Sequence, residues 1–315
     1  MKKLLIVLLL LASLLIAWGL GERQPAWGQS PIVSPVVYLP MVLNNWDGTP
    51  APTPTMPPTP TPVPLPTFQG VGHDRKWEQN EADWLCPALD LSGVSWYYDW
   101  TPYPIQCPGI EAVPMIWDET QISVPAQGNS EWLAVFNEPE FQSQAGLAPQ
   151  EAVAYYREVE QLYPDKKLIG PGVVHLWWLE DFWAAYVQAY GEPPRMDALA
   201  IHSYPQIVGD APTSTLIQRS INDIQAAIDF AAAHDIPEVW VTEFAVQPRG
   251  DPQKPIAYVT AMIAWFQAQS TVTRRAWFGL DLTGFWYLPD RPDYSALYDT
   301  SLVLSGELTP LGEVY

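Results

Sequence analysis

Two glutamates occupy the same kind of place in the sequence, because each directly follows a short apolar segment of strand character. Glu138 follows Trp132–Phe136 and Asn137, and Glu243 follows Val239–Thr242. Two carboxylates that face each other can cleave a glycosidic bond: one protonates the leaving oxygen, and the other attacks the anomeric carbon or activates water. The acid of such a pair holds its proton more tightly than an isolated carboxyl, since the charge of its neighbour opposes ionisation.

Side chains alternate along a strand, which predicts where the two carboxylates point. The residues predicted to share the inward face with Glu138 or Glu243 are Ala134, Phe136, Val239 and Val241. Small and apolar inward residues followed by a terminal glutamate would place each carboxylate at the mouth of a barrel. A single glutamate at a strand end is more often a solvated residue, so the prediction rests on the two motifs together.

The elements that must position these glutamates predict a (β/α)8 barrel. Residues 68–315 are close in number to the ~250 residues typical of that fold, and short apolar runs alternate there with helical patterns. Strands are predicted at Gln69–His73, Gly93–Tyr98, Ala112–Trp117, Trp132–Asn137, Lys167–Gly170, Met196–His202, Glu238–Glu243 and Arg275–Leu280. Helices are predicted at Pro149–Tyr163, Trp178–Tyr190, Ser214–His234 and Pro255–Gln269, with none over Trp100–Glu111 and a last, short one from Leu308. In this fold the active site lies at the C-terminal ends of the strands.

The composition narrows the choice of partners. The net charge of −20 would repel a phosphate backbone or a polyanionic polysaccharide, but it carries no penalty for a neutral polysaccharide. The chain also has 16 tryptophans, whose flat faces suit the C–H faces of sugars, although most single tryptophans are simply buried. We therefore expect a neutral polysaccharide or oligosaccharide as the substrate, no nucleic acid, and a monomer.

The N-terminus has the pattern of a secretory signal peptide. Lys2 and Lys3 precede an apolar run over Leu4–Trp18, and Ala26-Trp27-Gly28 places small residues where a signal peptidase cleaves. We predict a signal peptide over residues 1–28 and hence a secreted protein. The apolar run also approaches spanning length, so an uncleaved membrane anchor is the alternative.

A segment at 29–67 separates this leader from the predicted catalytic domain at 68–315. Proline alternates with threonine and small apolar residues over Thr49–Thr67, a composition that favours extended polyproline II and a semi-rigid spacer. Such a spacer would hold an extracellular domain away from a surface, which is compatible with cell-surface association. The short apolar patch at Val36–Leu43 has no assignable role.

Cys86 and Cys107 are the two cysteines of the chain. In an oxidising compartment such a pair forms one disulfide, and both residues are predicted near the bottom of the barrel. Two buried free thiols are the alternative, and nothing around them has metal-site spacing.

Other motifs give no further chemistry. His73, His175 and His234 have no partner at ligand spacing, and Gly170-Pro171-Gly172 is a turn rather than a phosphate loop, because no Lys-Ser/Thr follows it. The sequence also lacks the Gly-x-Ser-x-Gly elbow of serine hydrolases.

The two glutamate motifs resemble those of a known group of enzymes. Asn137-Glu138-Pro139 and Thr242-Glu243-Phe244 resemble the strand-four and strand-seven motifs of the large retaining (β/α)8 glycoside hydrolase clan. More specifically, residues 70–315 resemble glycoside hydrolase family 128, whose members act on β-1,3-glucans. The stretches that carry this resemblance are Val94–Trp100, Val113–Trp117, Phe136–Glu140, Ile201–Tyr204 and Trp240–Phe244.

The resemblance implies a role for each matching residue. Glu138 would be the general acid/base and Glu243 the nucleophile, with retention of configuration. Asn137 would hydrogen-bond the 2-hydroxyl of the sugar at the cleavage point, a bond that strengthens in the transition state. Tyr204 would hydrogen-bond the nucleophile, and His202 would support the site unless it is an ordinary packed core residue. The aromatic residues implied to bind sugar are Trp277, below the sugar at the cleavage point, and Trp96, Tyr98, Trp100 and Trp117, along the negative subsites.

The resemblance thus implies an endo-β-1,3-glucanase that needs no metal and no cofactor. Asp99 departs from the family pattern, which has asparagine there, and this leaves the glucan preference open. One alternative is a retaining hydrolase of the same clan that acts on xylan, mannan or mixed-linkage glucan. Another is a non-catalytic glucan-binding surface lectin on the same scaffold.

Overall fold

The computed structural model describes residues 68–76, 78–205, 211–247, 251–281 and 301–315. The predicted signal peptide, the linker and the apolar patch at 36–43 lie outside these residues. Among the residues that the structure describes, no helix is both long enough and apolar enough to cross a lipid bilayer.

The strands form one parallel sheet that closes on itself. Its strands are β1 (Phe68–Gly72), β2 (Trp96–Tyr98), β3 (Glu111–Ala112), β4 (Met115–Ile116), β5 (Trp132–Val135), β6 (Lys167–Ile169), β7 (Ala198–Ser203), β8 (Glu238–Phe244) and β9 (Val272–Phe278). The order is β3-β2-β1-β9-β8-β7-β6-β5-β4, so the two ends of the sheet are β3 and β4, which only Val113 and Pro114 separate. These two short strands act as one, and the eight predicted strand positions of the barrel are confirmed.

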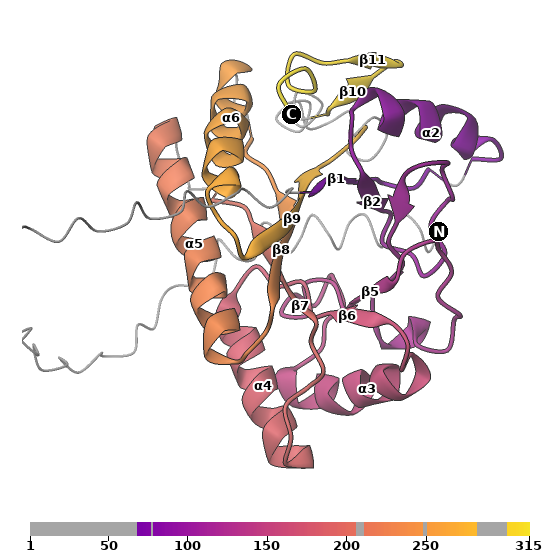
Figure 1. The fold of residues 1–315 in the computed structure, drawn as a ribbon, viewed down its shortest axis with the longest axis vertical. Coiled ribbons are helices and arrows are strands. Elements are labelled where there is room, and N and C mark those ends of the chain that lie inside the picture. The colour runs from indigo at the N-terminus through magenta and orange to yellow at the C-terminus, as the bar shows by residue number, and fades with distance from the viewer. Residues whose placement is uncertain (1–67, 77, 206–210, 248–250, 282–300) are drawn as a thin grey trace, which may run out of the picture.

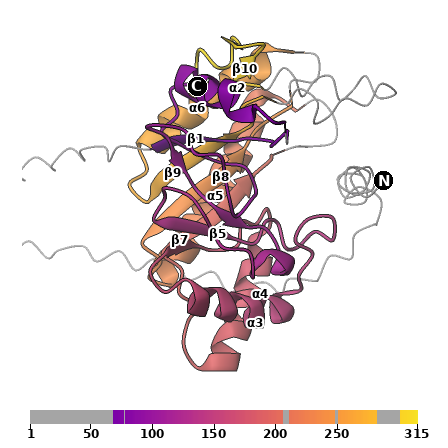
Figure 2. The same cartoon turned by 90° about the vertical axis from the view of Figure 1, so that its right-hand side faces the viewer.

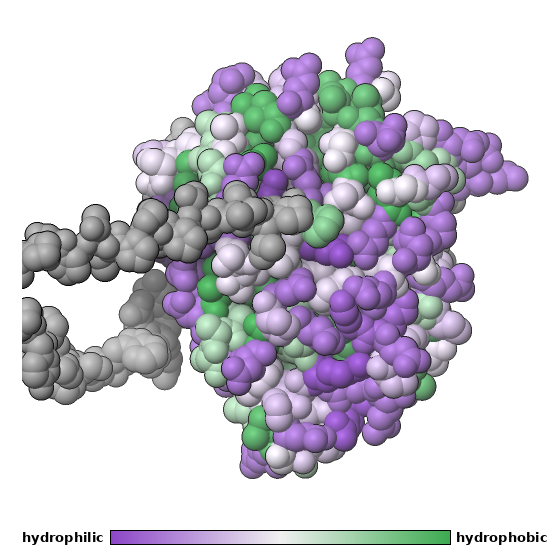
Figure 3. All heavy atoms as spheres, viewed as in Figure 1, coloured by the Kyte–Doolittle hydropathy of each residue, from purple (hydrophilic) through white to green (hydrophobic). Residues whose placement is uncertain are grey.

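Helices cover the outside of this ring (Figures 1 and 2). They are α2 (Glu81–Leu91), α3 (Pro149–Leu162), α4 (Leu176–Tyr190), α5 (Thr213–Ala233) and α6 (Gln253–Gln267), with a 3-10 turn at Glu119–Gln121. The four predicted long helices are confirmed within two residues at each end, and Trp100–Glu111 contains none. In Figure 3 hydrophobic residues on one face form separate patches within a largely hydrophilic surface.

The C-terminus differs from the prediction. The described residues after position 300 form an antiparallel pair, β10 (Val303–Leu304) and β11 (Glu307–Leu308), and not a helix that starts near Leu308. Gly306, at φ 81°, lies in the turn between the two strands and takes a conformation that glycine adopts readily. The chain ends with the Tyr315 hydroxyl donating to the Gly70 carbonyl at 2.6 Å, which fixes the terminus to β1.

Three indoles and one guanidinium fill the lower end of the barrel interior. The ring of Trp240 lies 5.2 Å from that of Trp96 and 4.7 Å from that of Trp132, centroid to centroid. The guanidinium of Arg274 lies 4.2 Å from the Trp240 ring and pairs with Glu111 at 2.5 Å, a cation–π arrangement with its charge neutralised. Smaller side chains complete this inner cluster, among them Ala134, Ala198, Ala200 and Ala276.

A disulfide joins Cys86 of α2 to Cys107, in the segment before β3. It links the first helix of the barrel to the long connection between β2 and β3, which has no helix of its own. The bond therefore ties this helix-free connection to α2.

Candidate active site

A bulge in β8 turns Glu243 into the barrel. The ladder with β7 skips one residue between Val241 and Glu243, so Thr242 is an extra residue. Val239 and Val241 lie in the outer apolar layer between strands and helices, and the prediction that they share the inward face with Glu243 is wrong. One inserted residue reverses the alternation of a strand, which brings Glu243 to the mouth of the barrel.

The end of β5 places Glu138 through two residues in the left-handed backbone region. Phe136 has φ 60° and Glu138 has φ 42°, values that are uncommon for non-glycine residues and often found at functional sites. Phe136 consequently leaves the inward face, and its ring packs 6.3 Å from that of Tyr156 in α3, contrary to prediction. The N–H of Glu138 donates to the carbonyl of Gly172 at 2.7 Å, which fixes the turn.

Three donors surround the buried carboxylate of Glu243. Its Oε1 accepts from the indole N–H of Trp100 at 3.0 Å and lies 3.1 Å from the hydroxyl of Tyr98. Its Oε2 accepts from the hydroxyl of Tyr204. Hydrogen bonds to a carboxylate favour its charged form and fix its orientation, as a nucleophile requires.

His202 lies between the two glutamates. Its Nδ1 is 2.9 Å from Oε1 of Glu138 and 3.5 Å from Oε2 of Glu243, and its side chain is 1% exposed. These three residues each offer an atom, and the atoms all lie within 4.8 Å of one another. The structure thus brings together Glu138, Glu243, His202 and Tyr204, four residues that the sequence pointed to.

Glu138, Glu243 and His202 influence one another's protonation. Burial raises the pKa of the Glu243 carboxyl above its ordinary value, while the charge of His202 and the hydrogen bonds from Tyr204 and Trp100 oppose that rise. Burial lowers the pKa of His202, but the two carboxylates outweigh it, so the pKa lies above its ordinary value. Groups this close titrate as a set rather than one by one.

The same three residues are also a donor set that a metal ion could use, since carboxylates and imidazole bind zinc and other divalent cations. However, both oxygens of Glu243 already accept hydrogen bonds from Tyr98, Trp100 and Tyr204. These donors would be lost or repelled if a cation took their place. The arrangement therefore fits a pair of working carboxyl groups better than a chelate.

Glu140 is a third carboxyl near the pair, one that sequence reasoning left without a role. Its Oε1 accepts from the N–H groups of Val174 and His175 at 2.7 and 2.9 Å, and its buried Oε2 has no hydrogen-bond partner in the described structure. Burial raises the pKa of Glu140 to about 7. A second acidic residue two positions after Glu138 was the sequence signal that could have found it.

Asn137 is buried beside Glu138, and its side-chain amide donates to Oε1 of Gln144 at 3.2 Å. Its Oδ1 is buried and has no partner within the described residues. A sugar hydroxyl is one group that could satisfy this oxygen, so the predicted role of Asn137 stays a prediction with a free acceptor to support it.

The predicted aromatic residues divide into two groups. Trp100 and Trp117 are half-buried against the inner cluster, and Tyr98 is buried below the mouth with its hydroxyl 3.1 Å from Oε1 of Glu243. Trp96 instead fills the bottom of the barrel, where its indole N–H donates to the carbonyl of Phe68. Its predicted place along a negative subsite is wrong, because β2 is three residues long and Trp96 begins it.

Trp277 does not lie below a sugar either. It is completely buried between the barrel and the helices, 5.1 Å from the ring of Phe244 and 6.4 Å from that of Tyr258. The inward residue of β9 near the mouth is the next one, Phe278, whose ring lies 5.8 Å from Trp100 and 5.9 Å from Tyr204. The prediction placed the aromatic one residue too early on the strand.

Asp99 lies behind the mouth rather than in it, being 2% exposed. Its Oδ1 accepts from the hydroxyl of Thr101 at 2.6 Å, and Oδ2 is 3.6 Å from the guanidinium of Arg75. Burial raises the pKa of Asp99, and Thr101 and Arg75 oppose that rise. A carboxylate at this position is thus part of an internal polar cluster.

Comparison with known families decides the assignment. Residues 76–315 match the model of the "Glycosyl hydrolase catalytic core", which covers the whole barrel apart from β1. The chain belongs to the glycosyl hydrolase catalytic core family. This protein is therefore a glycoside hydrolase. A comparison with curated proteins gives no match.

Solved structures confirm the resemblance of this glycosyl hydrolase to glycoside hydrolase family 128 in fold. One is a curdlan-specific exo-β-1,3-glucanase from Blastomyces gilchristii, solved with glucose, at 24% identity, TM-score 0.59, and coverage of 80% of this chain and 98% of that one. Another is an endo-β-1,3-glucanase from Amycolatopsis mediterranei, solved as a mutant with laminaripentaose, at 23% identity, TM-score 0.60, and coverage of 79% and 98%. A third is an endo-β-1,3-glucanase from Pseudomonas viridiflava, at 25% identity, TM-score 0.55, and coverage of 79% of this chain and 97% of that one.

Proposed function

We propose that this glycoside hydrolase is a retaining endo-β-1,3-glucanase in which Glu138 is the general acid/base and Glu243 the nucleophile. The observation that carries the proposal is the geometry of the pair. One oxygen of the Glu138 carboxyl lies within 4.8 Å of one oxygen of the Glu243 carboxyl. This separation is near the ~5–5.5 Å between the carboxyl groups of retaining enzymes. It is shorter than the ~6.5–9.5 Å that leaves room for a water molecule in inverting enzymes.

The environments of the two glutamates suit these two roles. In the first step an oxygen of Glu243 would attack the anomeric carbon while the proton of Glu138 passes to the leaving glycosidic oxygen. In the second, Glu138 would take a proton from water, whose oxygen attacks the same carbon and releases Glu243. Tyr98, Trp100 and Tyr204 hold Glu243 in place for the attack.

The substrate class rests on the relatives and on the charge. The family 128 structures that the chain resembles are β-1,3-glucanases, and some were solved with laminari-oligosaccharides. A net charge of −20 suits a neutral glucan. The N-terminal sequence supports secretion as part of the proposal, so that the enzyme would meet its polymer outside the cell.

Release of reducing sugar from laminarin tests the proposal, with xylan, mannan and mixed-linkage glucan alongside. Wild type should release sugar from laminarin, first as oligosaccharides of several lengths because cleavage is internal, and with the β configuration retained. Glu138→Gln and Glu243→Gln should each remove this activity and keep the wild-type circular dichroism. Glu158→Gln, an exposed glutamate on α3, is the matched control and should stay active.

Three other outcomes would contradict parts of the proposal. Activity confined to another polymer would keep the mechanism and discard the β-1,3-glucan. Full activity in either glutamine variant would remove that glutamate from its role. Laminarin binding without any sugar release would indicate the lectin alternative.

A further inference from the structure

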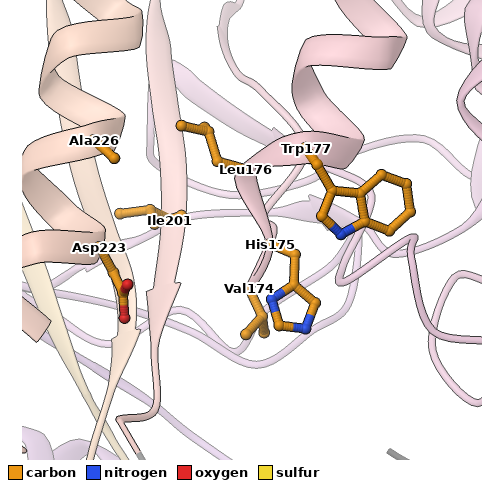
Figure 4. Close-up of a pocket in the computed structure, with 7 residues that line it drawn as sticks. All are labelled: Val174, His175, Leu176, Trp177, Ile201, Asp223 and Ala226. Carbon is orange, nitrogen blue, oxygen red and sulfur yellow. The ribbon is translucent and has the colours of Figure 1, made fainter. Parts of the chain in front are cut away.

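A cavity of about 180 Å³ lies outside the ring of strands, between the start of α4 and the middle of α5 (Figure 4). Leu176 and Ile201 contribute to its apolar wall, whereas His175, Trp177 and Asp223 supply an imidazole, an indole and a carboxyl. This space is below the ~300 Å³ of pockets for drug-sized ligands, so it suits one small ring. An apolar wall combined with an aromatic face and a few polar groups is the composition of a sugar subsite.

The polar groups of this cavity are available to a ligand. His175 and Asp223 both line the cavity, and both side chains are exposed. Burial lowers the pKa of His175, opposed by Asp223, which favours a neutral imidazole with one donor and one acceptor. Neighbouring sugar hydroxyls, each both donor and acceptor, would match such a pair.

Trp177 is the most exposed large aromatic side chain among the described residues, at 52%. An exposed indole beside a cavity offers a flat apolar face to a ligand. Trp178, the next residue, is almost fully buried and donates its indole N–H to the carbonyl of Leu147. The packing of the helix therefore requires the Trp178 indole and not the Trp177 indole.

The loop that lines the cavity is fixed to the segment that carries Glu138. Oε1 of Glu140 accepts from the N–H groups of Val174 and His175, and the rings of Phe141 and His175 are 5.7 Å apart. A general acid stands beside the leaving oxygen, so the departing part of the substrate lies on its side of the cleavage point. The half-buried Trp100 and Phe278 belong to other strands of the mouth, where they lie in contact at the ends of β2 and β9.

We propose that the cavity at His175, Trp177 and Asp223 binds a glucosyl unit of the substrate on the leaving-group side of the cleavage point. The unit would place its C–H face on the Trp177 indole, and its hydroxyls would bond to Asp223 and His175. This inference rests on the proposed function. The cavity would then contribute to the affinity of the enzyme for long glucan chains.

The test compares two substrates that differ in their leaving group. Laminarihexaose places sugars on both sides of the cleaved bond, whereas a nitrophenyl β-laminaribioside that loses nitrophenol has no sugar on the leaving side. In Trp177→Ala, the loss of kcat/KM on the hexaose should exceed the loss on the nitrophenyl substrate by about tenfold, the factor that corresponds to one aromatic contact. Asp223→Asn should give the same sign of difference.

Tyr190→Ala is the matched control, since Tyr190 is an exposed aromatic at the other end of the same helix, and it should match wild type on both substrates. Equal losses on both substrates in Trp177→Ala, or none on either, would overturn the inference. Wild type that cleaves neither substrate would instead refute the proposed function, and the inference with it.

Discussion

A Cβ atom added at Gly172 would lie only 2.9 Å from Nε2 of His202. Gly172→Ala should therefore push the imidazole away from Glu138, while the Gly172 carbonyl keeps its hydrogen bond from the Glu138 N–H. A displacement of this size at a catalytic group costs up to about a hundredfold in rate, and we expect kcat/KM on laminarin to fall tenfold or more. Kinetics with a thermal melt of the same sample separates this loss from unfolding, and a folded variant with wild-type kcat/KM would contradict the positioning of His202.

The same substitution at two tryptophans should have different effects. Trp96→Phe removes volume from the barrel bottom and a hydrogen bond to Phe68, so it should lower the free energy of unfolding by about 1–3 kcal/mol and leave KM unchanged. Trp100→Phe removes a donor to Glu243 and should lower kcat by about tenfold. Denaturant unfolding and kinetics on both variants check this, and a raised KM in Trp96→Phe would restore that residue to a sugar site.

Loss of the general acid should depend on the substrate. A leaving group such as dinitrophenolate departs without protonation, so Glu138→Ala should form the glycosyl-enzyme almost normally with a dinitrophenyl glycoside while losing most activity on laminarin. Added azide should then raise turnover, because it attacks the intermediate without a general base. Glu243→Ala should show no such recovery of a retained product, and equal behaviour of the two variants would contradict the assignment.

Glu140 should make stability depend on pH. Its pKa is raised from 4.5 to about 7 in the folded protein, so the folded state holds a proton that the unfolded state releases. Stability from this group is complete below about pH 4.5 and is lost as the pH rises towards 7 and above. Glu140→Gln does not titrate, and its stability relative to wild type should rise by about 2–3 kcal/mol across that window. Denaturant unfolding of both proteins from about pH 4.5 to 8 measures this, and a constant difference between them would be the contrary result.

The disulfide should stabilise the fold more than the site. Cys86 and Cys107 close a loop with a sequence separation of 21, and removing such a crosslink costs about 3 kcal/mol. The double variant Cys86→Ser/Cys107→Ser should therefore unfold at lower denaturant while the folded fraction keeps its kcat/KM. Wild type treated with reductant should behave in the same way, and unchanged stability in both would show that the bond is dispensable.

Much of the barrel could be predicted because its signals are local. Apolar runs of strand length, bounded by turns and followed by helical periodicity, placed eight strands and four helices near their observed positions. The glutamates were found because strand ends in this fold converge on one mouth. The C-terminal hairpin was missed because four residues of strand carry almost no periodicity, and Gly306 was the available turn signal.

Two of the errors at the site come from the assumption of unbroken alternation. The bulge at Thr242 and the left-handed Phe136 each shift the inward face by one residue. Both shifts occur within two residues before a glutamate, so Glu138 and Glu243 were selected from strand faces that were assigned incorrectly. On β9 the family resemblance pointed to Trp277, whereas Phe278 is the inward residue near the mouth. Such backbone irregularities depend on tertiary contacts and leave little trace in a single sequence.

The packed lower half of the barrel has a consequence for the order of events in a catalytic cycle. Within the described part of the chain, Trp96, Trp132, Trp240 and Arg274 fill the interior below the site and block a path through the barrel from beneath. Polymer, water and both halves of the cut chain must share one opening. In the proposed double displacement, the first half must therefore move aside before water can reach the glycosyl-enzyme, and its departure would set when the second step can begin.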